Sequence, residues 1–134
     1  MYRTSIRAFV AIIISTAAVA IGLSVASPAA AALPMPSGYY AGNVTSFPPG
    51  NTVWYGKRFT GGAVINNTAI GWAFPGRAYP GRSVLNNAPV IVVDYSGTSI
   101  GFVRDELTPD GRGGYWGDTI NGRAVLLRFH LARG

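Results

Sequence analysis

The sequence contains no cysteine, a single histidine (His130) and only five Asp or Glu among its 134 residues. Without cysteine the protein has no disulfides, so packing alone must stabilise it. One histidine and no thiol also argue against a transition-metal site, and we expect neither a metal nor a cofactor. Beyond the first quarter of the chain no helical spacing of apolar residues occurs. These absences favour a small all-β domain with an apolar core.

The first 32 residues have the features of an export signal. Arg3 and Arg7 form a basic start, residues 9–26 are an apolar run, and residues 27–32 supply small side chains for cleavage. The pattern predicts cleavage after Ala32 and a secreted protein. Retention of the run as a membrane anchor at the cell envelope stays open, because its 18 residues approach the roughly 20 that span a bilayer.

The remaining 102 residues are enough for one domain and carry a net charge of +4, since nine Lys or Arg face five acids. A basic exported protein attracts anionic surfaces such as those of the cell envelope, although so small an excess serves solubility equally well. Residues 33–50 hold four prolines and predict an extended arm lying against the domain, with the domain itself at 51–134.

Residues 89–107 are the stretch around which this domain is organised. Residues 89–94 include four β-branched residues in succession, Val90 to Val93, which predicts a strand covered on both faces. Ser96-Gly97-Thr98 predicts a turn, and residues 100–107 predict the returning strand of a β-hairpin. A strand covered on both faces lies at the centre of a fold.

Further short strands are predicted along the rest of the chain, at residues 53–59, 63–65, 69–74, 115–120 and 123–132. Turns are predicted at residues 60–62, 66–67 and 108–114, and Asn121-Gly122 suits a tight hairpin. An Ala-aromatic-Pro-Gly-Arg unit occurs twice, at 73–77 and 78–82, and predicts two type II turns. In the last strand Val125, Leu127, Phe129 and Leu131 share one apolar face.

Six to eight short strands joined by turns predict a small antiparallel β-barrel or sandwich.

Several short motifs follow one another in order: Trp-Tyr-Gly-Lys-Arg-Phe at 54–59, Pro-Val-Ile-Val-Val-Asp-Tyr at 89–95, Arg-Asp-Glu at 104–106 and Gly-Tyr-Trp-Gly at 114–117. With Asn66 and a Gly-x-Ser at 81–83, they resemble those of small secreted lipocalin-like proteins of bacteria and fungi that have no assigned function. The resemblance covers residues 53–131. It implies a compact calycin-type β-barrel and carries no catalytic residue.

Thr52 stands where the glycine of the Gly-x-Trp of many lipocalins would lie, and the domain is short for a barrel with a roomy pocket. Whether the barrel is hollow or filled by its own side chains therefore stays open.

The aromatic residues are more numerous than a core of this size requires, and we predict that six of them line an apolar pocket: Trp54, Trp72, Phe74, Tyr95, Phe102 and Trp116. Three arginines follow glycines in predicted turns and would meet the anionic end of a ligand: Arg77, Arg82 and Arg112. The sequence thus predicts a secreted lipocalin-like domain that binds a small apolar or amphipathic molecule.

The alternative is a structural or interaction module of the cell envelope with a filled core. Single-stranded nucleic acid would also suit aromatics and arginines, but export argues against that partner.

The segment 97–101, Gly-Thr-Ser-Ile-Gly, matches the nucleophile elbow of serine hydrolases, and an aspartate followed by His130 completes the order serine, acid, histidine. The elbow requires a following helix, whereas the sequence predicts a strand here. A small hydrolase using Ser99 and His130 is therefore the third hypothesis, and we expect no catalytic residue.

A pair formed by Asp94 with Asp105 or Glu106 could support acid–base chemistry. Pairing of such acids with Arg104, Arg128 or Tyr95 within the sheet is the commoner arrangement, and we expect it here.

Overall fold

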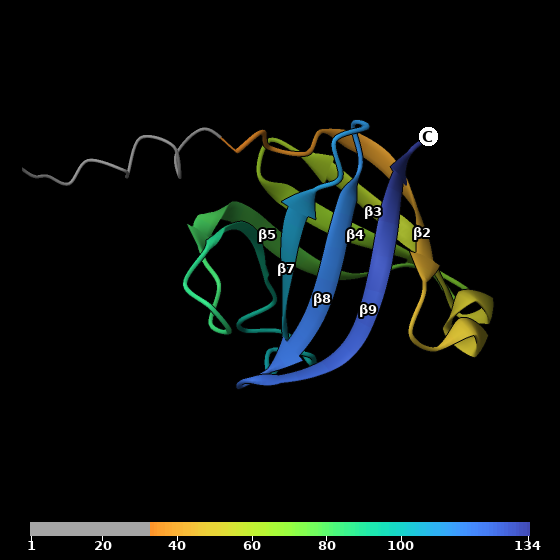
Figure 1. The fold of residues 1–134 in the computed structure, drawn as a ribbon. Coiled ribbons are helices and arrows are strands. Elements are labelled where there is room, and N and C mark those ends of the chain that lie inside the picture. The colour runs from red at the N-terminus through yellow and green to blue at the C-terminus, as the bar shows by residue number, and fades with distance from the viewer. Residues whose placement is uncertain (1–32) are drawn as a thin grey trace, which may run out of the picture. The chain divides into compact units, whose positions relative to one another are not determined.

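The computed structural model describes residues 33–134, so the predicted export signal lies outside the described residues. Eight antiparallel strands follow one another in chain order and close into a barrel, because the last strand pairs with the first (Figure 1). The strands are β2 (Gly38–Val44), β3 (Trp54–Thr60), β4 (Ala63–Thr68), β5 (Gly71–Arg82), β6 (Pro89–Asp94), β7 (Arg104–Pro109), β8 (Tyr115–Asn121) and β9 (Ala124–Arg133). The prediction of a small antiparallel β-barrel is confirmed. The described residues contain no helix that is both long and apolar enough to cross a membrane.

The barrel begins earlier than residue 51. Gly38–Val44 forms β2, which pairs with β3 through Tyr40 and Lys57 and with β9 through Tyr40 and Arg133. The four prolines of the predicted arm lie before and after this strand. Two are in residues 33–37, and two begin the short 3₁₀ helix η3 (Pro48–Thr52). The prolines therefore flank the ladder without interrupting it, and the region predicted as an arm supplies a strand of the barrel.

The two Pro-Gly pairs do not form the predicted turns, because both lie within the continuous strand β5. Phe74 and Pro75 together face Ile65 of β4, a bulge in which the missing amide of proline removes no ladder hydrogen bond. The backbone of Phe74 has a φ of 55°, in the left-handed region. Pro80 lies beyond Arg77, the last residue of β5 that pairs with β4, and so occupies a free edge.

Two other turns lie elsewhere than predicted. Asn66 and Asn67 belong to β4, and the chain turns at 69–70. In the last hairpin Asn121 pairs with Ala124, so the turn is one residue later, at 122–123.

The central hairpin is also looser than predicted. Strand β7 begins at Arg104 instead of residue 100, and residues 95–103 form a connection of successive turns closed by backbone hydrogen bonds, from Thr98 to Tyr95 and from Gly101 to Thr98 among others. Strand β6 is buried on both faces from Val90 to Val93, as predicted.

The two ends of the barrel differ. We call the end where β2 starts and β9 finishes the closed end. There the inward side chains of Tyr40, Phe59, Leu107, Tyr115 and Leu131 are almost fully buried. The ring of Tyr40 meets those of Phe59 and Tyr115 edge to face, each with 5.7 Å between centroids. At the opposite end, which we call the open end, lie η3 and the β4–β5, β6–β7 and β8–β9 connections.

Candidate ligand cavity at the open end of the barrel

A cavity of about 220 Å³ enters the barrel from the open end. Its apolar walls come from strands and from the connections at the mouth: Val44, Val53, Trp54, Phe74, Ile100, Val103, Leu127 and Phe129. Its polar lining residues are Lys57, Asn66, Tyr95, Asp105 and Thr119. The cavity is therefore an apolar space with a polar floor facing the closed end.

Two glycines give the largest rings of the wall their positions. The ring of Trp54 lies over Gly42 of β2, and the ring of Phe129 lies over Gly117 of β8, so close that a Cβ atom at either glycine would overlap the ring. The two rings then meet edge to face, with centroids 5.2 Å apart. Glycine in these strands thus allows two bulky side chains to fold against the barrel wall and leave the cavity beside them open.

The floor is built around Lys57, whose side chain is only 4% exposed. Its ammonium nitrogen Nζ lies 2.8 Å from Oδ2 of Asp105 and donates hydrogen bonds to the hydroxyl of Tyr95 (2.6 Å) and to Oδ1 of Asn66 (2.8 Å). An ammonium has three N–H groups, and each has a partner here. The buried charge is therefore fully paired.

The partners of Lys57 are also satisfied. The Tyr95 hydroxyl donates to Oδ2 of Asp105 (2.9 Å), and the Thr119 hydroxyl donates to Oδ1 of the same carboxylate (2.7 Å). The Asn66 amide accepts from the Trp54 indole (2.8 Å) and donates to the carbonyl of Phe74 (2.9 Å). A buried polar network stabilises a unique structure when all its members are paired, and this network meets that condition.

Protonation in this network follows from burial and the nearby charges. Desolvation by burial is the largest influence on the pKa of Lys57 and lowers it, but the electrostatic and hydrogen-bonding contributions of Asp105 and Tyr95 together outweigh it and hold that pKa above its ordinary value. Burial, together with the Asp105 charge, raises the pKa of Tyr95 to about 12. At neutral pH the floor thus holds a protonated amine and a neutral phenol. A protonated amine is no nucleophile, which argues against imine chemistry at Lys57.

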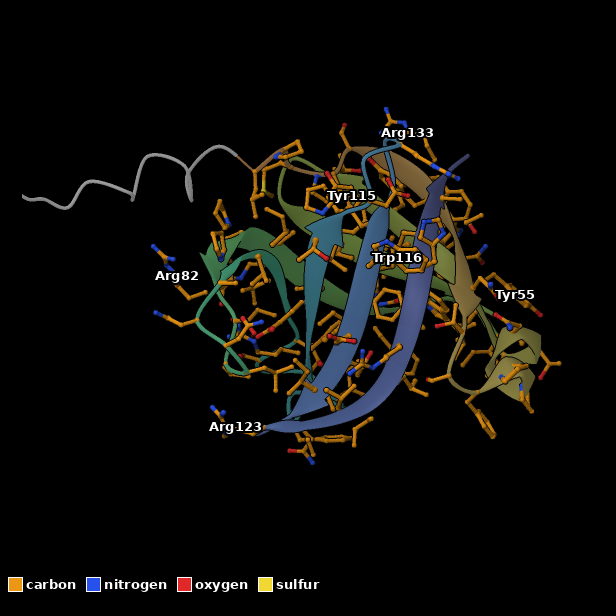
Figure 2. The ribbon with its side chains drawn as sticks, in the orientation of Figure 1. Tyr55, Arg82, Tyr115, Trp116, Arg123 and Arg133 are labelled. Atoms are coloured by element: carbon orange, nitrogen blue, oxygen red, sulfur yellow. The ribbon has the colours of Figure 1, made fainter. Side chains whose placement is uncertain are left out.

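Of the six aromatics predicted to line a pocket, the structure brings Trp54, Phe74 and Tyr95 together at the cavity. The other three lie elsewhere: the side chains of Trp72, Phe102 and Trp116 are 49%, 62% and 53% exposed, respectively. Trp72 packs on the outer surface against Arg58, and Trp116 lies on the outer face of β8 (Figure 2).

The three predicted arginines do not gather at the cavity. Arg82 ends β5, and Arg112 lies in the β7–β8 connection, both at the closed end, while Arg77 is exposed along β5. The four connections of the open end, residues 45–53, 69–70, 95–103 and 122–123, contain one charged residue, Arg123. Its guanidinium is hydrogen-bonded to backbone carbonyls of the loop 83–88. The mouth is thus almost free of charge.

The residues of the hydrolase hypothesis lie apart. Ser99 is exposed in the β6–β7 connection at the open end. His130 is on the outer face of β9 toward the closed end, where its Nε2 lies 2.7 Å from Oδ2 of Asp110 and its ring leans against Trp116. That hydrogen bond makes the largest contribution to lowering the pKa of Asp110. The structure therefore brings no triad together around Ser99.

The three acids considered for acid–base chemistry point to different partners, and the expected pairing is found for Glu106 with Arg104 and for Asp105 with Tyr95. Asp105 pairs with Lys57 inside the barrel, Glu106 binds Arg104 outside it (2.7 Å), and Asp94 accepts from the hydroxyl of Tyr79 (2.9 Å). Within residues 33–134, no hydrogen bond joins any two of these three carboxyl groups.

The polar floor was not among the predicted site residues. Simple alternation along residues 53–59 would place Lys57 on the face opposite Trp54, but a bulge between Trp54 and Gly56 shifts the register and brings both side chains to the cavity. One signal was available: the sequence uses arginine ten times and lysine once. A single lysine among arginines indicates a position that accepts a compact ammonium and excludes a planar guanidinium.

Residues 33–134 contain no group of three His, Cys, Asp or Glu side chains that could hold a metal ion. Comparison of the chain with protein-family models, with curated proteins and with solved structures finds no match.

Proposed function

We propose that this protein binds a small, uncharged, mainly apolar molecule in the cavity at the open end of the barrel. The observation that carries the proposal is an apolar space that opens to solvent and ends on a fully paired polar floor. Binding sites of this kind combine apolar walls with a few polar groups in fixed positions.

The size of the cavity limits the ligand. Its 220 Å³ is below the roughly 300 Å³ at which pockets for drug-sized molecules begin, but above the roughly 150 Å³ of an engineered cavity that binds benzene. The proposed ligand is therefore a single substituted ring or a short branched chain.

The charge pattern selects against an anionic ligand. Lys57 is neutralised by Asp105, and all its N–H groups are used. The floor atoms that can still form a hydrogen bond are acceptors, such as Oδ1 of Asp105, which has a second lone pair. A hydroxyl or amine that donates one hydrogen bond fits this floor better than a carboxylate, which would lie beside Asp105.

The mouth offers an apolar path into the cavity. Phe47, Val53 and Ile70, from two connections of the open end, are each more than half exposed, and Val53 also lines the cavity. Exposed apolar side chains gathered around an opening are typical of binding sites. The predicted export signal would place this function outside the cell.

The test is a titration followed by NMR, using toluene, para-cresol and benzoate as probes. The proposal expects the amides and methyls of Val103 and Leu127 to shift with toluene and more strongly with para-cresol, whose hydroxyl can donate to the floor. Benzoate at the same concentration should shift neither residue.

Two neighbouring leucines of β9 give a matched pair of variants. Leu127→Trp places a large ring in the cavity and should weaken cresol binding at least about tenfold, whereas Leu126→Trp changes a half-exposed residue on the outer face and should leave binding unchanged. Equal affinity in both variants would show that the cavity is not the site, and preferred binding of benzoate would contradict the proposed selection against anions.

The second candidate is an interaction module that takes no ligand. The complete pairing of the Lys57 network favours it, because a structural role alone explains that pairing. Absence of any shift with all three probes would favour this candidate.

A further inference from the structure

A second hollow lies on the outside of the barrel, separate from the cavity. It is a groove of about 430 Å³ across the outer faces of β7, β8 and β9, bounded on one side by the loop 83–88. Trp116 lies in this groove, on the front of the hairpin formed by β8 and β9 in Figure 2. Its other side chains with polar groups include Thr45, Asn86, Glu106, Thr108, Asp118 and Arg128.

The groove contains an acceptor without a donor. The side chain of Glu106 is 4% exposed, and three hydrogen bonds reach it: one from the amide of Val84 (2.9 Å) and two from the guanidinium of Arg104 (2.7 and 3.1 Å). All three end on Oε2, and no hydrogen bond within residues 33–134 reaches Oε1. A buried carboxylate oxygen without a partner is costly, so a donor from outside the protein would lower the free energy of the bound state.

The charges of the groove balance. Glu106 is paired with Arg104, and Asp118 lies 3.7 Å from the guanidinium of Arg128. The side chain of Arg128 is 64% exposed, so it retains donors for a ligand. A neutral groove with both donors and acceptors suits a neutral, polar molecule better than a strongly charged one.

An aromatic platform completes the site. Trp116 is 53% exposed, and its ring is held in place by His130, with 4.5 Å between ring centroids. A large exposed indole beside polar groups offers an apolar face to a ligand whose edges are polar. A sugar ring has this character, since its C–H faces are apolar and its hydroxyls point outward around the edge.

We propose that the outer groove is a carbohydrate-binding site, in which a sugar ring lies on Trp116, a hydroxyl donates to Oε1 of Glu106, and Asp118 and Arg128 bind further hydroxyls. The side chains that would contact the sugar come from the outer faces of the strands, and the one residue that borders both the groove and the barrel cavity is Phe129.

The test uses the protein with ¹⁵N-labelled indoles, cellotetraose and chitotetraose as saccharide probes, and choline as a cationic probe. The chain has three tryptophans, so three indole signals report on the cavity (Trp54), on the opposite outer surface (Trp72) and on the groove (Trp116). At least one saccharide should shift the Trp116 signal and leave the Trp72 signal unchanged.

Two exposed tryptophans give matched variants. Trp116→Ala should weaken saccharide binding at least about tenfold, and Trp72→Ala, at a side chain of similar exposure, should not change it. Asp118→Ala should weaken binding with the indole platform intact, and para-cresol binding in the cavity should be unchanged in all three variants.

The proposal is wrong if neither saccharide shifts the Trp116 signal at concentrations on the order of 10 mM, which corresponds to a binding free energy of only about −3 kcal/mol. A shift with choline alone would assign the groove to cations and also overturn it. Equal loss in Trp116→Ala and Trp72→Ala would exclude a specific site on Trp116.

Discussion

The closed and open ends of this barrel are built from the same eight strands but solve different problems. At the closed end, large apolar rings such as Tyr40, Phe59 and Tyr115 fill the interior. Toward the open end, an ion pair between Lys57 and Asp105 occupies the middle of the barrel and leaves an apolar space beyond it. Burial of apolar area stabilises the closed end, whereas at the open end complete hydrogen bonding offsets the cost of burying the ion pair. The comparison teaches that the barrel has its most tightly packed apolar side chains at one end and its open space at the other.

The largest effect is expected from breaking the ion pair. Asp105→Asn leaves the Lys57 ammonium buried without its counter-charge and should lower the free energy of unfolding by about 3–5 kcal/mol. The double variant Lys57→Met, Asp105→Leu removes both charges and should recover most of that loss. Urea unfolding measures both values, and a double variant as unstable as the single one would contradict this account of the floor.

Leucines at the two ends should respond differently to the same truncation. Leu131 is fully buried at the closed end, so Leu131→Ala should cost about 3 kcal/mol, including the cavity it creates. Leu127 already borders an empty space, and Leu127→Ala should cost about 1 kcal/mol because it removes fewer contacts. The free energies of unfolding of the two variants measure the difference. Equal losses would show that the open end is packed as tightly as the closed end.

Alkaline pH should act on the floor. The folded-state pKa of Tyr95 is raised to about 12, so its contribution is fully present below the unfolded-state pKa near 10 and is lost between about pH 10 and 12. The raised pKa of Lys57 has the same sign and acts from about pH 10.5 upward. Together they should lower the free energy of unfolding by several kcal/mol across that window, since each unit of pKa shift corresponds to about 1.4 kcal/mol.

Unfolding measured from pH 8 to pH 12 tests this prediction. In Tyr95→Phe the alkaline loss should shrink. Tyr115→Phe is the matched control at the closed end, where burial also raises the tyrosine pKa, and it should leave the Tyr95 part of the loss in place. A Tyr95→Phe protein with an unchanged alkaline profile would contradict the role given to that hydroxyl.

The sequence predicted the fold wherever side-chain alternation was regular. Strand β9 alternates from Val125 to Leu131, and β6 is continuously β-branched, so both were recognised. Strand β5 was broken into turns because Pro-Gly pairs are commoner in turns than in strands. A bulge and a free edge, which depend on neighbouring strands and leave no local sign, make those prolines acceptable.

The candidate site was predicted only in part, for the same reason. Trp54, Phe74 and Tyr95 were expected at a pocket and lie there, but the floor was missed because the bulge after Trp54 reverses the expected face of Lys57. Trp72 and Trp116 have the same side chain as Trp54, and nothing in their local sequence shows that their rings point outward while that of Trp54 points inward. Only the pairing of strands decides that.

The central claim is that the open end is hollow, and crystals exposed to pressurised xenon test it most directly, because xenon occupies empty apolar cavities. The account predicts one strong xenon site among Phe74, Val103 and Leu127, and none at the closed end around Tyr40. Loss of that site in Leu127→Trp would confirm its position. A protein that takes up no xenon there, or takes it up among the rings of the closed end, would contradict the division of the barrel into a packed half and a binding half.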